Sequence, residues 1–135
     1  MDSNAKIIIV DDHELFREGM KILIEMQGLG TVIAEAENGE EFLELLEKHN
    51  PDLVLMDIKM PVMGGLEACE KAIANKPDLK ILALTMFCEK ASYNAMLKAG
   101  AMGYLPKTSG KDELEKAIKT IMGGKTYFSK KNMRK

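Results

Sequence analysis

Two short apolar segments of this 135-residue chain each end directly in aspartate. Residues 7–10 (Ile-Ile-Ile-Val) lead into Asp11 and Asp12, and residues 53–56 (Leu-Val-Leu-Met) lead into Asp57. A continuous apolar run of this length is typical of a strand that is buried on both faces of a parallel sheet. Carboxylates that follow two such strands would meet at one edge of the sheet. There each pair would repel by roughly 4 kcal/mol at a separation of about 4 Å and an effective dielectric near 20, so we expect a cation between them.

Strand-like apolar segments alternate with amphipathic helical segments along the whole chain. This alternation predicts an α/β fold with five parallel strands, covered on both faces by five helices and joined by right-handed crossovers. The predicted strands span residues 5–10, 31–36, 53–56, 79–85 and 102–105. In such sheets ligands bind outside the carboxyl ends of the strands, so the residues that follow the strands are the candidates for a functional site.

Five side chains are expected at that edge of the sheet: Asp11, Asp12, Asp57, Thr85 and Lys107. Mg²⁺, or Mn²⁺ in its place, binds carboxylate, phosphate and water oxygens, so we expect Asp12 and Asp57 to be direct ligands and Asp11 to hold a coordinated water. Asp57 is also the best candidate for a nucleophile that becomes an aspartyl phosphate. The Lys107 ammonium and the Thr85 hydroxyl would then stabilise the phosphoryl group.

Composition excludes several other classes of protein. A content of 46% hydrophobic and 30% charged residues is ordinary for a globular domain. No apolar stretch approaches the roughly 18 residues of a membrane helix, and the first residues lack the layout of a signal peptide. Cys69 and Cys88 have no disulfide or metal spacing, which indicates free thiols in the cytoplasm.

The charge of the chain is uneven. Residues 1–115 hold 12 basic and 21 acidic side chains, a net charge of −9, which disfavours direct binding to nucleic acid. Residues 116–135 hold seven Lys or Arg and no acid. We interpret residues 125–135 as a solvated basic linker or tail, and a nucleic-acid-binding arm is the alternative.

Several motifs occur in a characteristic order over residues 5–124. They are Asp11-Asp12, Asp57 followed by Met60-Pro61, Thr85, Gly103-Tyr104 and Lys107. This set resembles the receiver domain of response regulators in two-component signalling. Residues 10–13 (Val-Asp-Asp-His), 17–19 (Arg-Glu-Gly), 99–105 and 123–129 are similar to the NarL/LuxR-type subfamily.

The resemblance implies a flavodoxin-like doubly wound (βα)5 fold with strand order 2-1-3-4-5 and a receiver (phosphoacceptor) domain over residues 1–124. It implies a phosphorylation-activated signalling switch rather than an enzyme. A sensor histidine kinase would donate a phosphoryl group to Asp57. Mg²⁺ would be held by Asp11, Asp12, Asp57 and the backbone carbonyl of Lys59.

The resemblance also implies a switching mechanism. Thr85 would move toward the phosphoryl group and Tyr104 would swing inward behind it, so that a local change of charge shifts a two-state element. Lys59 and Phe87 would line the mouth of the site and tune the lifetime of the phosphate. Pro106 precedes Lys107, whereas proline more often follows the lysine in the family, so the geometry of the Lys107–Thr108 peptide bond stays open.

Relatives in this subfamily usually continue into a helix-turn-helix domain. We therefore expect residues 125–135 to begin a connection to a DNA-binding output domain that lies outside this chain and regulates transcription. The alternative is a natural single-domain regulator or phosphorelay intermediate that acts through protein contacts. Phosphorylation could also drive homodimerisation through the first and last helices, although we expect their exposed residues to be mostly charged.

Two other functions of similar α/β sheets are disfavoured. A phosphatase with an aspartate nucleophile would carry a second aspartate two residues later, where this chain has Lys59. A flavin-binding domain would need a phosphate-binding loop after the first strand, and Asp11 and Asp12 would repel that phosphate.

Overall fold

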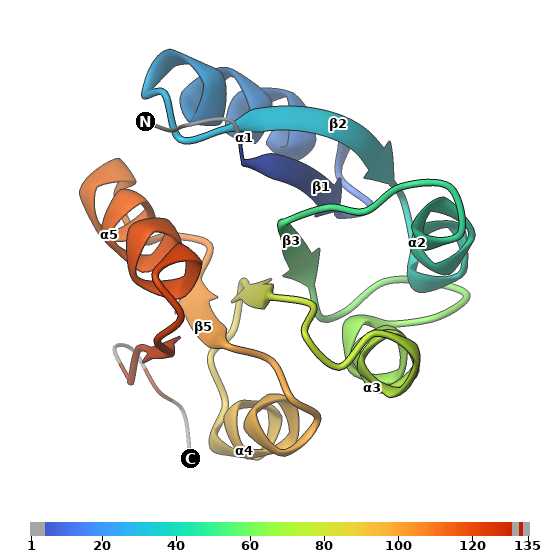
Figure 1. The fold of residues 1–135 in the computed structure, drawn as a ribbon. Coiled ribbons are helices and arrows are strands. Elements are labelled where there is room, and N and C mark those ends of the chain that lie inside the picture. The colour runs from blue at the N-terminus through green and yellow to red at the C-terminus, as the bar shows by residue number, and fades with distance from the viewer. Residues whose placement is uncertain (1–4, 131–132, 134–135) are drawn as a thin grey trace.

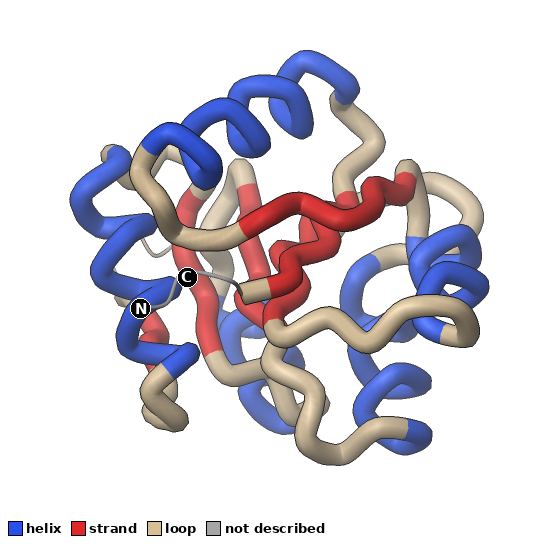
Figure 2. Tube along the Cα trace, turned by 45° about the horizontal axis from the view of Figure 1, so that its top comes forward, coloured by secondary structure: helices blue, strands red, loops and turns tan. Residues whose placement is uncertain are grey.

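A six-stranded parallel sheet lies between two layers of helices in the structure, a computed structural model that describes residues 5–130 and residue 133 (Figures 1 and 2). The elements are β1 (Lys6–Val10), α1 (Glu14–Met26), β2 (Thr31–Ala36), α2 (Gly39–Leu46), β3 (Leu53–Asp57), α3 (Gly65–Asn75), β4 (Ile81–Thr85), α4 (Lys90–Lys98), β5 (Gly103–Pro106), α5 (Lys111–Met122) and β6 (Tyr127–Phe128). The strand order is β2-β1-β3-β4-β5-β6, and each neighbouring pair is parallel. The predicted α/β class and the order of the first five strands are therefore confirmed.

Both faces of the sheet are buried, which is why its strands are continuous apolar runs. Ile7 and Ile9 of β1 pack in one hydrophobic cluster with residues of α1 and α5. Ile8 and Val10 point to the other face and pack in a second cluster with residues of α2, α3 and α4. Figure 1 shows the same division, with α1 and α5 on one face and α2, α3 and α4 on the other. Among the described residues, no helix has the length and hydrophobicity needed to cross a membrane.

The prediction of five strands is wrong by one, because Tyr127 and Phe128 form β6 beside β5. The Tyr127 amide donates to the Met102 carbonyl over 2.8 Å, and the Ser129 amide donates to the Tyr104 carbonyl over 2.9 Å. Without β6, β5 would be an edge strand with unpaired backbone groups. A two-residue strand has no periodicity to detect, so this segment looked like a solvated linker.

Two further expectations can be checked only in part. The peptide bonds of the described residues, Lys107–Thr108 included, are trans. The last basic residues of the predicted tail, Lys131, Arg134 and Lys135, lie outside the described residues, as do residues 1–4, whose sequence lacks the layout of a signal peptide.

Gly65 brings the start of α3 against the end of β3. Its amide donates to the Ile58 carbonyl over 2.7 Å. A Cβ atom at this position would collide with the Asp57 carbonyl oxygen and would lie 2.9 Å from Ile58 Cα. Only glycine therefore allows α3 to begin this close to the backbone of Asp57.

We predict that Gly65→Ala lowers the free energy of unfolding by about 1–3 kcal/mol, because the methyl group collides with backbone atoms that cannot move aside like a flexible side chain. Gly19→Ala is the matched control. Gly19 lies within α1, and no atom lies within 4 Å of the place that a Cβ would take there, so alanine should stabilise the protein by roughly 0.5–1 kcal/mol. Urea denaturation of the three proteins measures both effects, and equal stability of Gly65→Ala and the unchanged protein would contradict the prediction.

Candidate functional site

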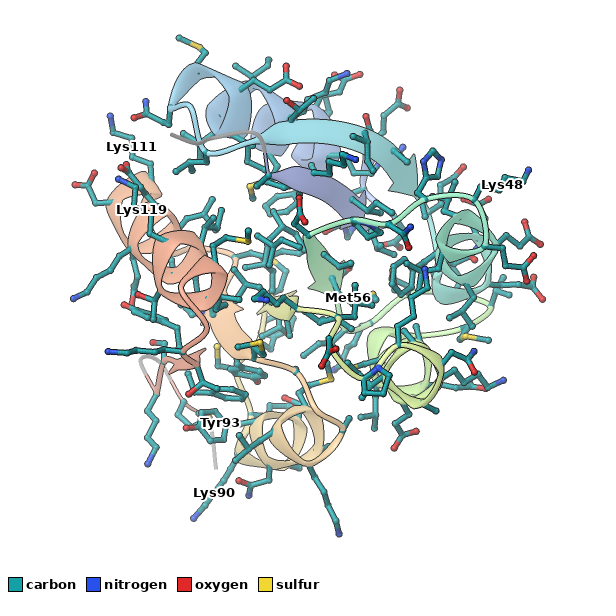
Figure 3. All side chains as sticks on the ribbon, viewed as in Figure 1. Lys48, Met56, Lys90, Tyr93, Lys111 and Lys119 are labelled. Carbon is teal, nitrogen blue, oxygen red and sulfur yellow. The ribbon has the colours of Figure 1, made fainter. Side chains whose placement is uncertain are left out.

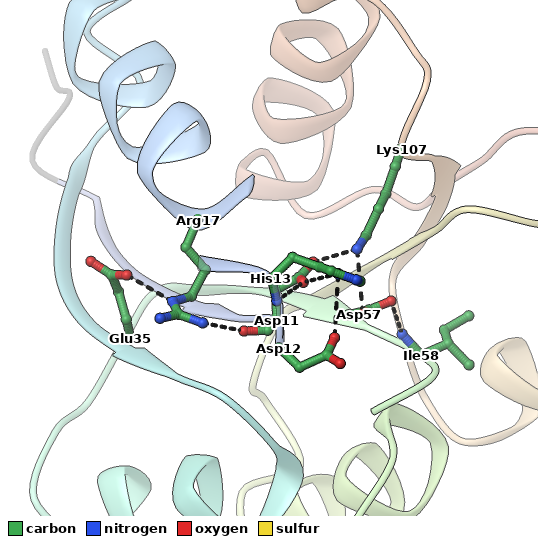
Figure 4. Close-up of polar contacts among 8 residues, drawn as sticks. All are labelled: Asp11, Asp12, His13, Arg17, Glu35, Asp57, Ile58 and Lys107. Carbon is green, nitrogen blue, oxygen red and sulfur yellow. Dashed lines mark hydrogen bonds and ion pairs between the residues drawn. The ribbon is translucent and has the colours of Figure 1, made fainter. Parts of the chain in front are cut away.

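The carboxyl ends of four adjacent strands bring the predicted site residues to one edge of the sheet. Asp11 directly follows β1, Asp57 ends β3, Thr85 ends β4, and Lys107 directly follows β5. These strands are neighbours in the order β1-β3-β4-β5. Figure 4 shows Asp11, Asp57 and Lys107 converging there, together with Asp12 from the loop after β1.

Lys107 is the buried cation of this edge. Its Nζ lies 2.5 Å from Asp11 Oδ2 and 3.3 Å from Asp57 Oδ2. The side chains of all three residues are at most 6% exposed. Lys107 Nζ also lies 4.5 Å from the centroid of the Phe16 ring, in a cation–π contact. Buried charges are stable only when they are paired, so these groups depend on one another.

One ammonium does not balance three carboxylates, and the imbalance is visible in the pKa of Asp57. Burial, followed by the charge of Asp11, raises this pKa to about 6. Lys107 acts in the opposite direction, as does the hydrogen bond that the Ile58 amide donates to Asp57 Oδ1 over 2.8 Å. An ionised carboxylate at this position therefore lowers the stability of the folded protein unless further positive charge lies nearby.

The remaining donors at this edge fit a divalent cation. Asp12 Oδ1 is buried and accepts no hydrogen bond from the described residues, and His13 Nδ1 lies 3.4 Å from it. Asp11, Asp12, His13 and Asp57 each offer a ligand atom, and these atoms lie within 4.8 Å of one another. Oxygen-rich donors with two negative charges in excess of Lys107 are what Mg²⁺ or Mn²⁺ requires.

Two residues of this edge were missed or assigned no role from the sequence. His13 is an exposed residue at the start of α1, its amide donates to Asp11 Oδ1 over 2.8 Å, and its Nδ1 lies 3.1 Å from the same oxygen. Arg17 Nη1 donates to the Asp11 carbonyl over 2.6 Å, and Arg17 Nε donates to Glu35 Oε1 over 3.0 Å. The adjacency of His13 to two predicted ligands was the available signal. The contact between Arg17 and Glu35 joins α1 to β2, which only the folded chain brings together.

Thr85 is engaged with the loop between β4 and α4. Its hydroxyl donates to the Phe87 carbonyl over 3.2 Å and accepts from the Phe87 amide over 3.3 Å. Phe87 is 47% exposed, and Lys59, two residues after Asp57, is also exposed. The roles of the Lys59 carbonyl as a ligand and of both residues in phosphate lifetime stay predictions.

Tyr104 is fully buried, so it already occupies an inward position. Its hydroxyl lies 2.6 Å from Ser92 Oγ and accepts from the Glu89 amide over 3.1 Å. Tyr93 of α4, labelled in Figure 3, places its ring edge-on against both Tyr104 and Phe128, with centroids 5.3 Å apart in each pair. Tyr104 therefore connects β5 to the start of α4 by hydrogen bonds and, through Tyr93, to β6 by ring contacts.

The raised pKa of Asp57 predicts a pH-dependent stability without divalent cations. Between about pH 4 and pH 6 the folded protein holds a proton that the unfolded chain releases, so stability is lost as the pH rises through this window. Asp57→Asn removes the buried charge. We expect it to increase the free energy of unfolding by about 1–3 kcal/mol near pH 8, with a smaller difference near pH 4.

Chemical denaturation with a chelator present measures this difference, and Asp78→Asn, at an exposed aspartate, is the matched control. An effect of Asp57→Asn that is the same at both pH values would contradict the raised pKa.

Comparisons with known proteins agree with the fold and the motifs. Residues 7–119 match the family of the response regulator receiver domain. The transcriptional regulatory protein DegU of Brevibacillus brevis is 42% identical over 130 residues, which cover 96% of this chain and 55% of that protein. The chain thus spans about half the length of this relative.

Two solved structures show the same likeness in three dimensions. A LuxR-family two-component response regulator from Aurantimonas sp. SI85-9A1 superposes with a TM-score of 0.90 at 36% identity, covering 96% of this chain and 92% of that one. The isolated REC domain of RcsB from Salmonella enterica serovar Typhimurium, solved with the phosphomimetic BeF3⁻, has a TM-score of 0.86 at 25% identity and covers 96% of both chains. With its sheet order, its edge of carboxylates and these matches, the chain belongs to the response regulator receiver domain family, in the NarL/LuxR-type group of two-component signalling proteins.

Proposed function

We propose that this chain is a phosphorylation-activated switch, in which Asp57 accepts a phosphoryl group from a sensor histidine kinase. The observation that carries the proposal is the pairing of a buried carboxylate with a buried ammonium, Asp57 Oδ2 with Lys107 Nζ at 3.3 Å. An Asp57 oxygen attacks the phosphorus of a phosphohistidine, the P–N bond breaks, and the kinase histidine leaves with the electron pair of that bond. This reaction modifies the protein's own aspartate. We therefore class the chain as a signalling protein and not as an enzyme.

Lys107 has a second partner during this transfer. Its contact with Asp11 Oδ2, at 2.5 Å, would hold the ammonium at the edge of the sheet when Asp57 carries the phosphoryl group as an acyl phosphate. The ammonium can then pair with a phosphoryl oxygen in place of the carboxylate that it loses. Lys107 thus stabilises charge on the transferred group without having to move far.

Asp11, Asp12, Asp57 and the backbone carbonyl of Lys59 would hold Mg²⁺, or Mn²⁺, which supplies positive charge to the phosphoryl oxygens when it is bound. The buried Asp12 Oδ1 without a hydrogen bond from the described residues supports this assignment, as does the raised pKa of Asp57. Asp12 Oδ1 accepts no hydrogen bond from the described residues, and Lys107 offsets the charge of Asp57 only in part, so a bound cation would stabilise both carboxylates.

The switch would run from Thr85 through the loop between β4 and α4. A phosphoryl group on Asp57 offers the Thr85 hydroxyl a charged acceptor in place of the Phe87 carbonyl. Release of Phe87 would shift the loop that leads to Glu89, whose amide bonds the Tyr104 hydroxyl. Because Tyr104 is already fully buried, phosphorylation would favour this arrangement among alternatives and would not have to create it.

We further infer that the switch controls transcription in the cytoplasm through a DNA-binding output domain outside this chain. The relative DegU, which carries the name of a transcriptional regulatory protein, supports this inference. We keep the receiver domain at residues 1–124, with β6 as a docked part of the segment that follows. A natural single-domain regulator stays the alternative.

Homodimerisation on phosphorylation has structural support that the sequence did not suggest. α1 exposes an apolar stripe of Leu15, Ile22 and Met26, which are 83%, 58% and 78% exposed. The exposed residues of α1 and α5 together are mostly charged, as expected, and this apolar stripe on α1 is the exception. A second copy of the chain could cover this stripe.

The test is incubation with Mg²⁺ and a small acyl phosphate, followed by intact mass measurement. We expect a single phosphoryl adduct that requires Mg²⁺, is absent from Asp57→Asn and is retained in the control Asp78→Asn. An adduct that survives Asp57→Asn, or no adduct in the unchanged protein, would contradict the proposal.

A further inference from the structure

We propose that His13 sets the metal preference of the site, because its imidazole adds a nitrogen ligand to the carboxylates. The site would then bind ions such as Ni²⁺ and Co²⁺ more tightly, relative to Mg²⁺, than its oxygen ligands alone would allow. This inference rests on the metal site of the proposed function and extends it to the identity of the ion.

The distances around His13 match those between neighbouring ligands of a single ion. His13 Nδ1 lies 3.1 Å from Asp11 Oδ1 and 3.4 Å from Asp12 Oδ1 (Figure 4). Ligands at right angles around an ion with bonds of about 2.1 Å lie about 3 Å apart. The imidazole therefore faces the same point as the two carboxylates, although it carries no ligand signature in the sequence.

The backbone around His13 holds the residue in this place. His13 precedes the first turn of α1, its amide donates to Asp11 Oδ1 over 2.8 Å, and its carbonyl accepts from the Arg17 amide over 3.1 Å. Arg17 in turn bonds the Asp11 carbonyl. The side chain itself is 64% exposed, so an ion could bind the imidazole without first burying it.

The chemistry of the two kinds of ion differs at this point. Imidazole nitrogen suits nickel, copper, zinc and iron, whereas Mg²⁺ prefers oxygen ligands and retains water. Carboxylates alone also bind transition-metal ions more tightly than Mg²⁺, so the informative quantity is the ratio of the two affinities with and without the imidazole.

A simpler role for His13 makes a different prediction. If Nδ1 only donates a hydrogen bond to Asp11 and lies near Asp12, its removal frees both carboxylates. The affinities for Mg²⁺ and Ni²⁺ would then change by the same factor. Measurement of both ions separates the two roles.

The experiment is isothermal titration calorimetry of the tag-free protein with MgCl2 and, separately, with NiCl2. For His13→Gln we expect the ratio of Ni²⁺ to Mg²⁺ affinity to fall at least about tenfold, which corresponds to about 1.4 kcal/mol. His49→Gln is the matched control, because His49 lies in the loop before β3, at the opposite edge of the sheet, and the ratio should stay unchanged. Addition of Co²⁺ should give visible absorption that changes in His13→Gln and not in His49→Gln.

A ratio that changes less than about threefold in His13→Gln, or Ni²⁺ binding that survives Asp12→Asn, would overturn the inference. In either case the unchanged protein would still be phosphorylated on Asp57 by an acyl phosphate. Failure of this inference is therefore distinguishable from failure of the proposed function. Absence of Mg²⁺ binding to the unchanged protein would overturn both.

Discussion

The pairing of Lys107 with Asp11 and Asp57 is the interaction on which the edge of the sheet depends. Three strand ends can converge there only because a buried ammonium, 2.5 Å and 3.3 Å from the two carboxylates, offsets part of their repulsion. The offset is incomplete, because burial and then the charge of Asp11 still raise the pKa of Asp57 to about 6. A fully neutralised site would have no electrostatic reason to accept a cation, whereas this one holds three carboxylates and one ammonium, so negative charge remains in excess.

Asp11 and Thr85, at the carboxyl ends of β1 and β4, also connect this edge of the sheet to the surrounding helices and loops. Asp11 is held by Lys107 from β5 and by Arg17 from α1, and Arg17 extends to Glu35 of β2. On the other side, Thr85 bonds Phe87 in the loop that leads to the contacts of Tyr104. Hydrogen bonds therefore connect Asp11 to α1 and β2, and Thr85, at the end of the neighbouring strand β4, bonds the loop that leads to α4.

Much of this arrangement could be predicted, because parallel strands impose it. Once residues 53–56 are a buried strand, Asp57 must lie at its carboxyl end, and the same reasoning applies to Asp11, Thr85 and Lys107. The direction of a side chain after the strand end does not follow from such a pattern. The convergence of His13 on Asp12, the bond from Arg17 to Glu35, the burial of Tyr104 and the pairing of β6 all need contacts between segments distant in the sequence or local geometry that periodicity does not encode.

The sixth strand has a consequence for the direction in which the chain continues. Because β6 is parallel to β5, its carboxyl end lies at the same edge of the sheet as Asp57 and Lys107. Any segment that follows Phe128 therefore starts from the functional edge of the molecule and not from the opposite one. This segment begins beside Tyr93 and the backbone of Tyr104. A displacement of β5 would therefore also move the point from which the following segment starts.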